Sequence, residues 1–123
     1  MSSRPSNSAV GRAGEEAAAV FLAGQGYQIL ARNVRFRGGE IDLVAEKTGV
    51  LVFVEVKTRA SLGFGTAAEA VTPQKQRQLI RLAAQYLAAS GRPERPCRFD
   101  VVTVEAAQTG GWSCHLIQDA FQA

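Results

Sequence analysis

The chain of 123 residues lacks the long apolar runs that mark membrane proteins and secretory leaders. No stretch approaches the roughly 20 apolar residues that a membrane-spanning helix needs. The opening residues, MSSRPSNSAVGRAG, contain no continuous apolar segment of the kind found in a secretory signal. We therefore expect a cytoplasmic protein with no membrane segment, and the length predicts a single domain.

Cysteine and histidine are also scarce. The two cysteines, Cys97 and Cys114, are too few for a disulfide framework and lack metal-ligand spacing, so we expect two reduced thiols. The single histidine, His115, argues against a His-based metal site and against a Ser-His-Asp triad. The sequence thus indicates neither a disulfide scaffold nor a zinc or serine hydrolase.

The charge is modest in sum but uneven in kind. The net charge is +3, and eleven of the 14 basic residues are arginine. Arginine binds phosphate through a planar fork, so this composition is compatible with a nucleic-acid partner. An arginine-biased genome would give the same composition without any functional meaning. Composition alone leaves both interpretations open.

Apolar spacing and turn residues predict two helices and five strands. A mobile tail is expected over residues 1–10, which are rich in Ser, Pro and Asn, and a single domain over 11–123. Thr72 is suited to cap the second helix, with Pro73 at its first position. The expected elements are a helix from Gly11 to Gly26, a strand over 27–36, a hairpin over 38–59, a helix from Pro73 to Gly91, and strands over 97–106 and 112–121. This order predicts an α/β fold with helices packed on a mixed five-stranded sheet.

The hairpin GGEIDLVAEKTGVLVFVEVKTR, residues 38–59, carries charges where a buried sheet should have none. A two-residue turn at Thr48-Gly49 places Asp42 opposite Glu55. One face then carries Glu40, Asp42, Val44, Glu46, Leu51, Phe53, Glu55 and Lys57. The other, nearly all apolar, carries Ile41, Leu43, Ala45, Lys47, Val50, Val52, Val54 and Val56. A slip of one residue would mix the two faces, so the hydrophobic pattern selects this register.

Two opposed carboxylates in a partly buried sheet need a counter-charge. Asp42 and Glu55 repel each other, and burial costs each ion its hydration. Lys57 supplies one positive charge, whereas Mg²⁺ accepts carboxylate oxygens together with phosphate oxygens. We interpret these residues as a site for Mg²⁺ or Mn²⁺, to which the Val56 carbonyl can add a ligand, with Lys57 orienting or deprotonating the attacking water. The alternative is a solvated hairpin end whose charges form surface pairs worth about 0–1 kcal/mol.

Several motifs in order along residues 11–105 carry a family resemblance. GGEID and FVEVKTR resemble the PD-(D/E)xK nuclease superfamily. GRAGEEAAAVFL, GYQILARN, GEIDLVA, FVEVKTR, FGTAAEAV and RFDVV together resemble the YraN-like family of small bacterial proteins. That family is predicted to be endonuclease-like and is similar to archaeal Holliday junction resolvases. The resemblance implies a restriction-endonuclease-like α/β fold and a substrate of branched or recombination-derived DNA.

The resemblance also assigns roles to residues. Asp42 matches the first metal-binding acid, Glu55 the second, and Lys57 the catalytic lysine. Glu15, in the pair of residues Gly-Glu that opens the first helix, matches an accessory acid, although complementation of the helix dipole explains it equally well. Because the related resolvases are dimers, the resemblance implies a homodimer that acts on two strands.

Basic residues near the proposed site are candidates for contacts with DNA phosphates. These candidates are Arg35, Arg37, Arg59 and Lys75. The alternative for the arginines is a solvated charge, and for Lys75 it is a solvated residue of the first helical turn. Asp100, in the RFDVV motif, either supports the site or forms a structural pair with Arg98. Two rival functions stay open: a nucleic-acid-binding module that does not cleave, and a structural or adaptor protein that uses the site only to hold a stabilising ion.

Overall fold

The computed structural model describes residues 7–59 and 71–123. Its elements follow the predicted order of one helix, three strands, one helix and two strands. They are α1 (Asn7–Gly24), β1 (Gln28–Phe36), β2 (Gly39–Lys47), β3 (Val50–Arg59), α2 (Pro73–Ala89), β4 (Cys97–Ala106) and β5 (Trp112–Phe121). Within the described ranges, neither helix has the length and apolar character needed to cross a membrane.

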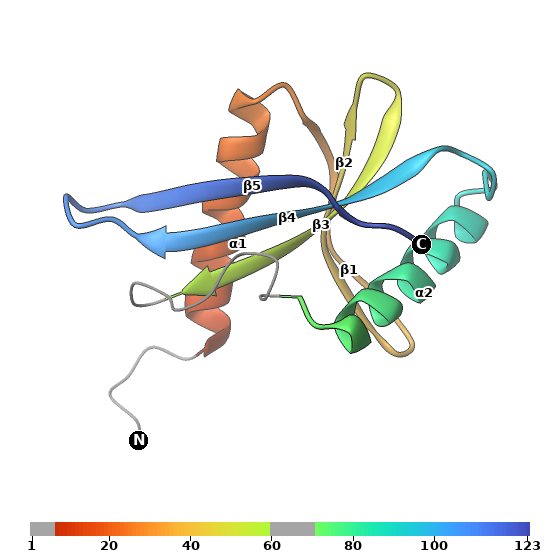
Figure 1. Ribbon diagram of the computed structural model, residues 1–123, viewed down its shortest axis with the longest axis horizontal. Coiled ribbons are helices and arrows are strands. Elements are labelled where there is room, and N and C mark those ends of the chain that lie inside the picture. The colour runs from red at the N-terminus through yellow and green to blue at the C-terminus, as the bar shows by residue number, and fades with distance from the viewer. Residues whose placement is uncertain (1–6, 60–70) are drawn as a thin grey trace.

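The five strands form one mixed sheet in the order β1-β2-β3-β4-β5. Neighbouring strands are antiparallel except for β3 and β4, which run parallel. Parallel neighbours need a crossover connection, and α2 lies in that connection. Figure 1 shows the twisted sheet with the two helices packed against it. The predicted mixed five-stranded α/β fold is confirmed.

The sheet is buried on both faces. Beneath α1, one core gathers Ala18, Ala19, Leu22, Tyr27, Leu43, Ala45, Val52, Val54, Val56, Val102 and Val104. Beneath α2, the other gathers Ile41, Val44, Leu51, Phe53, Val71, Leu79, Leu82, Ala83, Leu87, Phe99, Val101 and Phe121. The middle strand of the order, β3, supplies alternate residues to the two cores, as β2 and β4 on either side of it also do in part.

The helix α1 begins at Asn7, four residues before the Gly11 start that the sequence suggested. Ala9 and Val10 are half-buried, so the helix gains apolar contacts by extending past Gly11. At its other end the helix stops at Gly24, and Gly26 adopts a φ of +91° in the turn that follows. The predicted tail therefore includes one turn of helix, and residues 1–6 lie outside the described residues.

Helix α1 approaches β3 closely at Gly14. A Cβ atom built on Gly14 would lie 1.9 Å from Oγ1 of Thr58 and 2.9 Å from two further side-chain atoms of that residue. Only a residue without a side chain fits this contact, because real Cβ atoms do not approach other heavy atoms so closely. The contact between Gly14 and Thr58 thus fixes the distance between α1 and β3. Gly14 directly precedes Glu15 on the helix, and Thr58 directly follows Lys57 on the strand.

The hairpin of β2 and β3 has the predicted turn and register. Thr48 and Gly49 adopt φ values of 49° and 84°, the positive values that a type I′ turn requires. The ladder continues from Lys47 opposite Val50 down to Leu43 opposite Val54 and ends there. The register expected from the hydrophobic pattern is therefore confirmed over these five pairs.

Beyond Leu43 the expected alternation of faces fails. Ile41, expected on the same face as Leu43, packs in the α2 core instead, whereas Leu43 packs in the α1 core. The neighbouring strand is irregular at the same level, because Asn33 of β1 has a positive φ of 50° and the ladder passes over it. The break in alternation centres on Asp42, and it turns the acidic end of β2 towards α1.

Candidate functional site

Three carboxylates meet at the broken end of β2. Glu15 of α1 and Glu40 and Asp42 of β2 each offer an oxygen, and these oxygens all lie within 4.8 Å of one another. Asn33 holds Glu15 in place, because its side-chain amide donates a hydrogen bond of 2.7 Å to Oε1 of Glu15. Burial is the main cause that raises the pKa of Glu15, and the nearby charge of Asp42 adds to it.

The side chain of Asp42 takes the place of a backbone hydrogen-bond acceptor where the β2–β3 ladder ends. The backbone N–H of Val56 donates to Oδ2 of Asp42 at 2.8 Å, a bond that a strand carbonyl would accept in a regular ladder. Burial, followed by the charge of Glu55, raises the pKa of Asp42 to about 8. The carboxylate is thus held in a fixed orientation and in surroundings that disfavour its negative charge.

Glu55 lies on β3 beside Asp42, and its side chain points towards α2. The residue is only 9% exposed, and its Oε1 atom is buried with no hydrogen-bond partner among the described residues. Burial raises the pKa of Glu55, whereas the positive charge of Lys75 opposes that rise. A buried carboxylate oxygen with no donor costs free energy, and it can be satisfied by a proton shared with Asp42 or by a bound cation.

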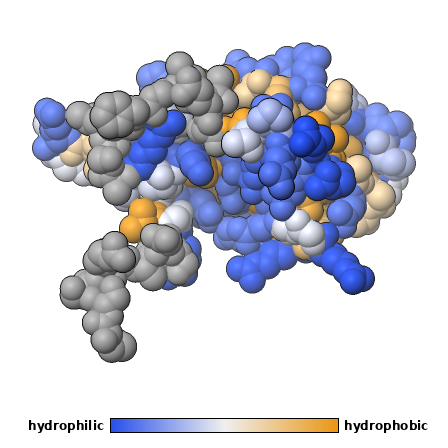
Figure 2. Space-filling view, turned by 60° about the horizontal axis from the view of Figure 1, so that its bottom comes forward, coloured by the Kyte–Doolittle hydropathy of each residue, from blue (hydrophilic) through white to orange (hydrophobic). Residues whose placement is uncertain are grey.

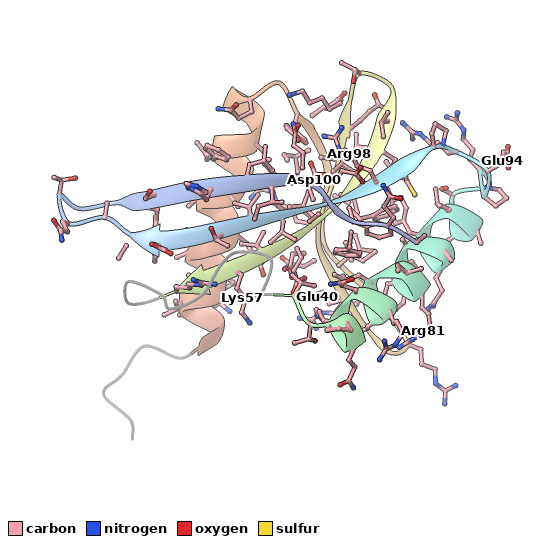
Figure 3. All side chains as sticks on the ribbon, viewed as in Figure 1. Glu40, Lys57, Arg81, Glu94, Arg98 and Asp100 are labelled. Carbon is pink, nitrogen blue, oxygen red and sulfur yellow. The ribbon has the colours of Figure 1, made fainter. Side chains whose placement is uncertain are left out.

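Two lysines flank the carboxylates from different elements. Lys75, in the first turn of α2, lies with Nζ 3.7 Å from Oε2 of Glu55. Lys57 is exposed on β3 two residues after Glu55, and its charge also lowers the pKa of Glu55. Figure 3 shows Lys57 and Glu40 on the same lower side of the molecule. Of the two lysines, Lys75 is therefore the one that forms an ion pair with Glu55 among the described residues.

The donor set fits a hard divalent cation. Four carboxylates, those of Glu15, Glu40, Asp42 and Glu55, come from three separate elements, and one buried oxygen has no partner among the described residues. Oxygen donors of this kind are the ligands that Mg²⁺ and Mn²⁺ prefer. Val56 contributes to the geometry through its N–H, and coordination by its carbonyl stays a prediction.

The predicted phosphate contacts differ in their surroundings. Arg35 donates to Glu40 at 2.9 Å, and Arg59 lies 4.0 Å from Oε1 of Glu105. Arg37 is exposed near the turn between β1 and β2. Figure 2, which brings the lower side of Figure 1 forward, shows hydrophilic residues interspersed with hydrophobic ones on this face. Of these three arginines, Arg35 lies against a carboxylate of the cluster, Arg59 lies against Glu105, and Arg37 is exposed.

Asp100 belongs to a separate polar network. It is fully buried and accepts hydrogen bonds from the Tyr27 hydroxyl at 2.7 Å, from Arg98 at 2.9 and 3.1 Å and from the Asp119 N–H at 2.9 Å. No carboxylate of the proposed site is among these partners. Of the two roles open from the sequence, the structural pair with Arg98 is the one that the contacts support.

Sequence reasoning left out two contributors to the site. Glu40 was placed on the acidic face but not among the ligands, because the break in alternation that turns it towards Glu15 has no signal in the pattern. Gly14 was not singled out, although a glycine inside an otherwise good helix is a signal of close packing. Glu40 supplies a third carboxylate oxygen to the cluster, and Gly14 lets α1 bring Glu15 close to the sheet.

Comparisons with known proteins place these residues in a family. A family model described as uncharacterised protein family UPF0102 matches residues 14–104, a range that includes all four carboxylates and both lysines. The UPF0102 protein STH1475 of Symbiobacterium thermophilum is 62% identical over 114 residues, which cover 93% of this chain and 97% of that protein. A UPF0102 protein of Chlorobaculum parvum is 55% identical over 97 residues, or 79% of this chain and 75% of that protein.

Among solved structures, the chain is similar to SfsA of Pyrococcus furiosus, whose structure was solved in complex with Ca²⁺. The TM-score is 0.40 and the sequence identity 13%, over 85% of this chain and 61% of that one. The sequence matches carry the assignment. They confirm the resemblance to the YraN-like family, and the chain belongs to the uncharacterised protein family UPF0102.

Proposed function

We propose that this protein is a metal-dependent endonuclease that hydrolyses phosphodiester bonds in DNA. The observation that carries the proposal is the acidic cluster itself. Carboxylate oxygens of Glu15, Glu40 and Asp42 lie within 4.8 Å of one another, and Glu55 lies beside Asp42 with one buried oxygen that has no partner among the described residues. Holding like charges close together lowers the stability of a fold, and such clusters are typical of functional sites. The resemblance to resolvases adds the substrate class, which is branched or recombination-derived DNA.

Each residue has a proposed role. Asp42 and Glu55 hold Mg²⁺ or Mn²⁺, with Glu15 and Glu40 as accessory acids on the side of α1. When bound, such an ion lowers the pKa of a water ligand and stabilises the negative charge that develops on the phosphate. Lys57, exposed next to the carboxylates, orients the attacking water or offsets the charge on the phosphate. The Val56 N–H keeps Asp42 in the orientation that these roles require.

Cleavage of a branched DNA substrate in Mg²⁺ or Mn²⁺ tests the proposal directly. We expect nicking that needs the ion and that falls by about 10²-fold or more in Lys57→Ala and Asp42→Asn. DNA binding should survive both changes. Glu94→Gln is a control for Asp42→Asn, because it removes the same negative charge from a residue that is exposed in the α2–β4 connection, away from Lys57 and Glu40 in Figure 3.

A second measurement separates metal binding from cleavage. Mg²⁺ or Mn²⁺ should raise the melting temperature of the wild type and of Glu94→Gln, since an ion that binds only the folded state stabilises it. Asp42→Asn and Glu55→Gln should lose that rise. DNA binding without cleavage in any divalent ion would favour the non-cleaving module, and an ion-dependent rise without DNA binding would favour the structural role.

The proposal extends to location and assembly. We place the protein in the cytoplasm and expect a homodimer, because a two-fold pair can address two strands of a branched substrate. Light scattering coupled to size-exclusion chromatography measures the mass of the particle. A monomer at micromolar concentration that still cleaves both strands would contradict the proposed dimer but not the proposed chemistry.

A further inference from the structure

A polar groove of about 220 Å³ runs along the first half of α2. Thr72, Gln74, Lys75, Gln78 and Arg81 line it. Among these described lining residues, two are cations, three carry neutral hydrogen-bonding groups, and none is an acid. The groove also lies at the N-terminal end of the helix, where the backbone dipole favours anions. Its chemistry is thus the opposite of the acidic cluster beside it.

Lys75 connects the groove to the acidic cluster. The side chain lines the groove, and its Nζ atom lies 3.7 Å from Oε2 of Glu55. An anion bound in the groove would therefore share Lys75 with the carboxylate of Glu55. A ligand that carries separate phosphates along a chain can place one phosphate in the groove and the next at the carboxylates.

The groove is fixed relative to the strand that carries Glu40 and Asp42. The Gln78 side chain donates a hydrogen bond of 2.7 Å to the carbonyl of Gly38, in the turn before β2. Gly39 allows this contact, because a Cβ atom on it would lie 2.6 Å from Nε2 of Gln78 and 3.1 Å from Leu82. The first half of α2 is thus locked to the start of β2.

We propose that this groove binds a backbone phosphate of the nucleic acid next to the one held at the carboxylates, with Arg81 as its outer cation. This inference rests on the proposed function and adds to it a path for the strand along α2. Lys75 is already a candidate phosphate contact from the sequence, and the groove adds Arg81, Gln74 and Gln78 to it. In Figure 3, Glu40 lies between Lys57 and Arg81 along the lower side of the molecule.

A phosphodiester fits the groove better than a carboxylate ligand does. Amide and hydroxyl donors together with arginine and lysine are the groups that contact phosphate oxygens in nucleic-acid complexes. A peptide that binds the groove through one carboxylate would bring no cation to the site, and any second carboxylate that it placed there would be repelled by the carboxylates of the site. A nucleic-acid strand can instead share the cation that neutralises those carboxylates.

The salt dependence of DNA binding tests Arg81. We compare Arg81→Gln with Arg77→Gln, which removes the same charge from an exposed residue of the same helix that does not line the groove. Affinity for a branched DNA oligonucleotide is measured at several salt concentrations with Ca²⁺ present. We expect the log–log slope for Arg81→Gln to be less steep than that of the wild type by about 0.7–0.9, the share of one phosphate contact.

Arg77→Gln should keep the slope of the wild type, and Arg81→Lys should restore most of the slope that Arg81→Gln loses. Equal slopes for Arg81→Gln and Arg77→Gln, in a protein whose wild type binds and cleaves DNA, would overturn the groove and leave the proposed function standing. Failure of the wild type to bind DNA or RNA at low salt would overturn both. Arg81 is exposed, so melting temperatures should match across the three variants.

Discussion

At the scale of single residues, the feature that decides the behaviour of the site is the pair of carboxylates on adjacent strands. Asp42 and Glu55 are brought together by the register of the hairpin and then partly removed from water. Burial and the charge of Glu55 raise the pKa of Asp42 to about 8, while the Val56 N–H partly offsets this rise. The fold therefore holds a proton on this pair under conditions in which an ordinary aspartate has lost it.

The raised pKa of Asp42 predicts the pH dependence of stability. In the unfolded chain Asp42 titrates near its ordinary value of 3.8, whereas in the fold it holds its proton up to about pH 8. Between these values unfolding releases a proton, so the free energy of unfolding falls as the pH rises from about 4 to about 8 and levels off above that. We expect Asp42→Asn to remove most of this fall.

Urea unfolding of wild type and Asp42→Asn at pH 4, 6, 8 and 9 measures the effect. The variant should gain about 1–3 kcal/mol relative to the wild type at pH 9 and much less at pH 4, because only the charged form is penalised by burial. Glu94→Gln should show no such trend. A stability difference that stays constant from pH 4 to pH 9 would contradict the raised pKa.

At the scale of elements, the contact of α1 with β3 sets the position of Glu15. Gly14→Ala places a methyl group where Oγ1 of Thr58 stands, so the helix must move away from the strand. We expect a loss of about 1–3 kcal/mol in the free energy of unfolding, the usual cost of overpacking. The affinity for Mn²⁺ should fall as well, because Glu15 moves with the helix.

The matched control for that change is Gly11→Ala on the same helix. Nothing lies within 4 Å of a Cβ atom on Gly11, so alanine there should stabilise the protein by up to about 1 kcal/mol through its helix propensity. Chemical denaturation and Mn²⁺ titration of both variants give the comparison. Equal stabilities for the two alanine variants would show that the close approach at Gly14 is relaxed in solution.

Local signals explain why some elements were predicted well. The boundaries of β4 and β5 match the prediction, because proline, glycine and polar turn residues bound both strands. Helix α2 begins as expected, with the Thr72 hydroxyl accepting from the Lys75 N–H at 3.2 Å. These features depend on neighbours in the chain, which a single sequence displays.

The parts that were missed depend on contacts between distant segments. The sequence alone does not show that Ile41 leaves the face of Leu43. The change of face accompanies the hydrogen bond from the Val56 N–H to Asp42 and the positive φ of Asn33, which are contacts and angles set by neighbouring strands. The 3.7 Å contact between Lys75 and Glu55 likewise requires knowing where α2 begins relative to β3. The residue types of the site were visible in the sequence, whereas their partners were not.

At the scale of the whole molecule, stability and the proposed chemistry are carried by separate polar groups. The network around Asp100 ties the start of β1 to β4 and β5 through the hydroxyl of Tyr27, which donates to Asp100 and accepts from Arg98 and Gln118. Tyr27→Phe should lower the free energy of unfolding by about 1–3 kcal/mol, because it removes one of the four hydrogen bonds that the buried Asp100 accepts among the described residues and the acceptor that Arg98 and Gln118 share.

The same variant should keep the rise in melting temperature that Mn²⁺ causes, since Tyr27 does not contact the acidic cluster in the described contacts. Tyr86→Phe, in the core beneath α2, is the matched control and should cost less, because no hydrogen bond of its hydroxyl occurs among the described residues. Loss of the Mn²⁺ effect in Tyr27→Phe would show that the two polar groups are coupled through the sheet.

The hydrogen bond from Val56 to Asp42 gives the protein a built-in spectroscopic reporter. A backbone amide that donates to a carboxylate has a resonance that follows the charge on that carboxylate, so the ¹H–¹⁵N signal of Val56 should shift as Asp42 titrates near pH 8 and again on addition of Mg²⁺. The amide of Val54, in the regular ladder opposite Leu43, should stay in place. One peak in a two-dimensional spectrum can thus follow the state of the site without any substrate.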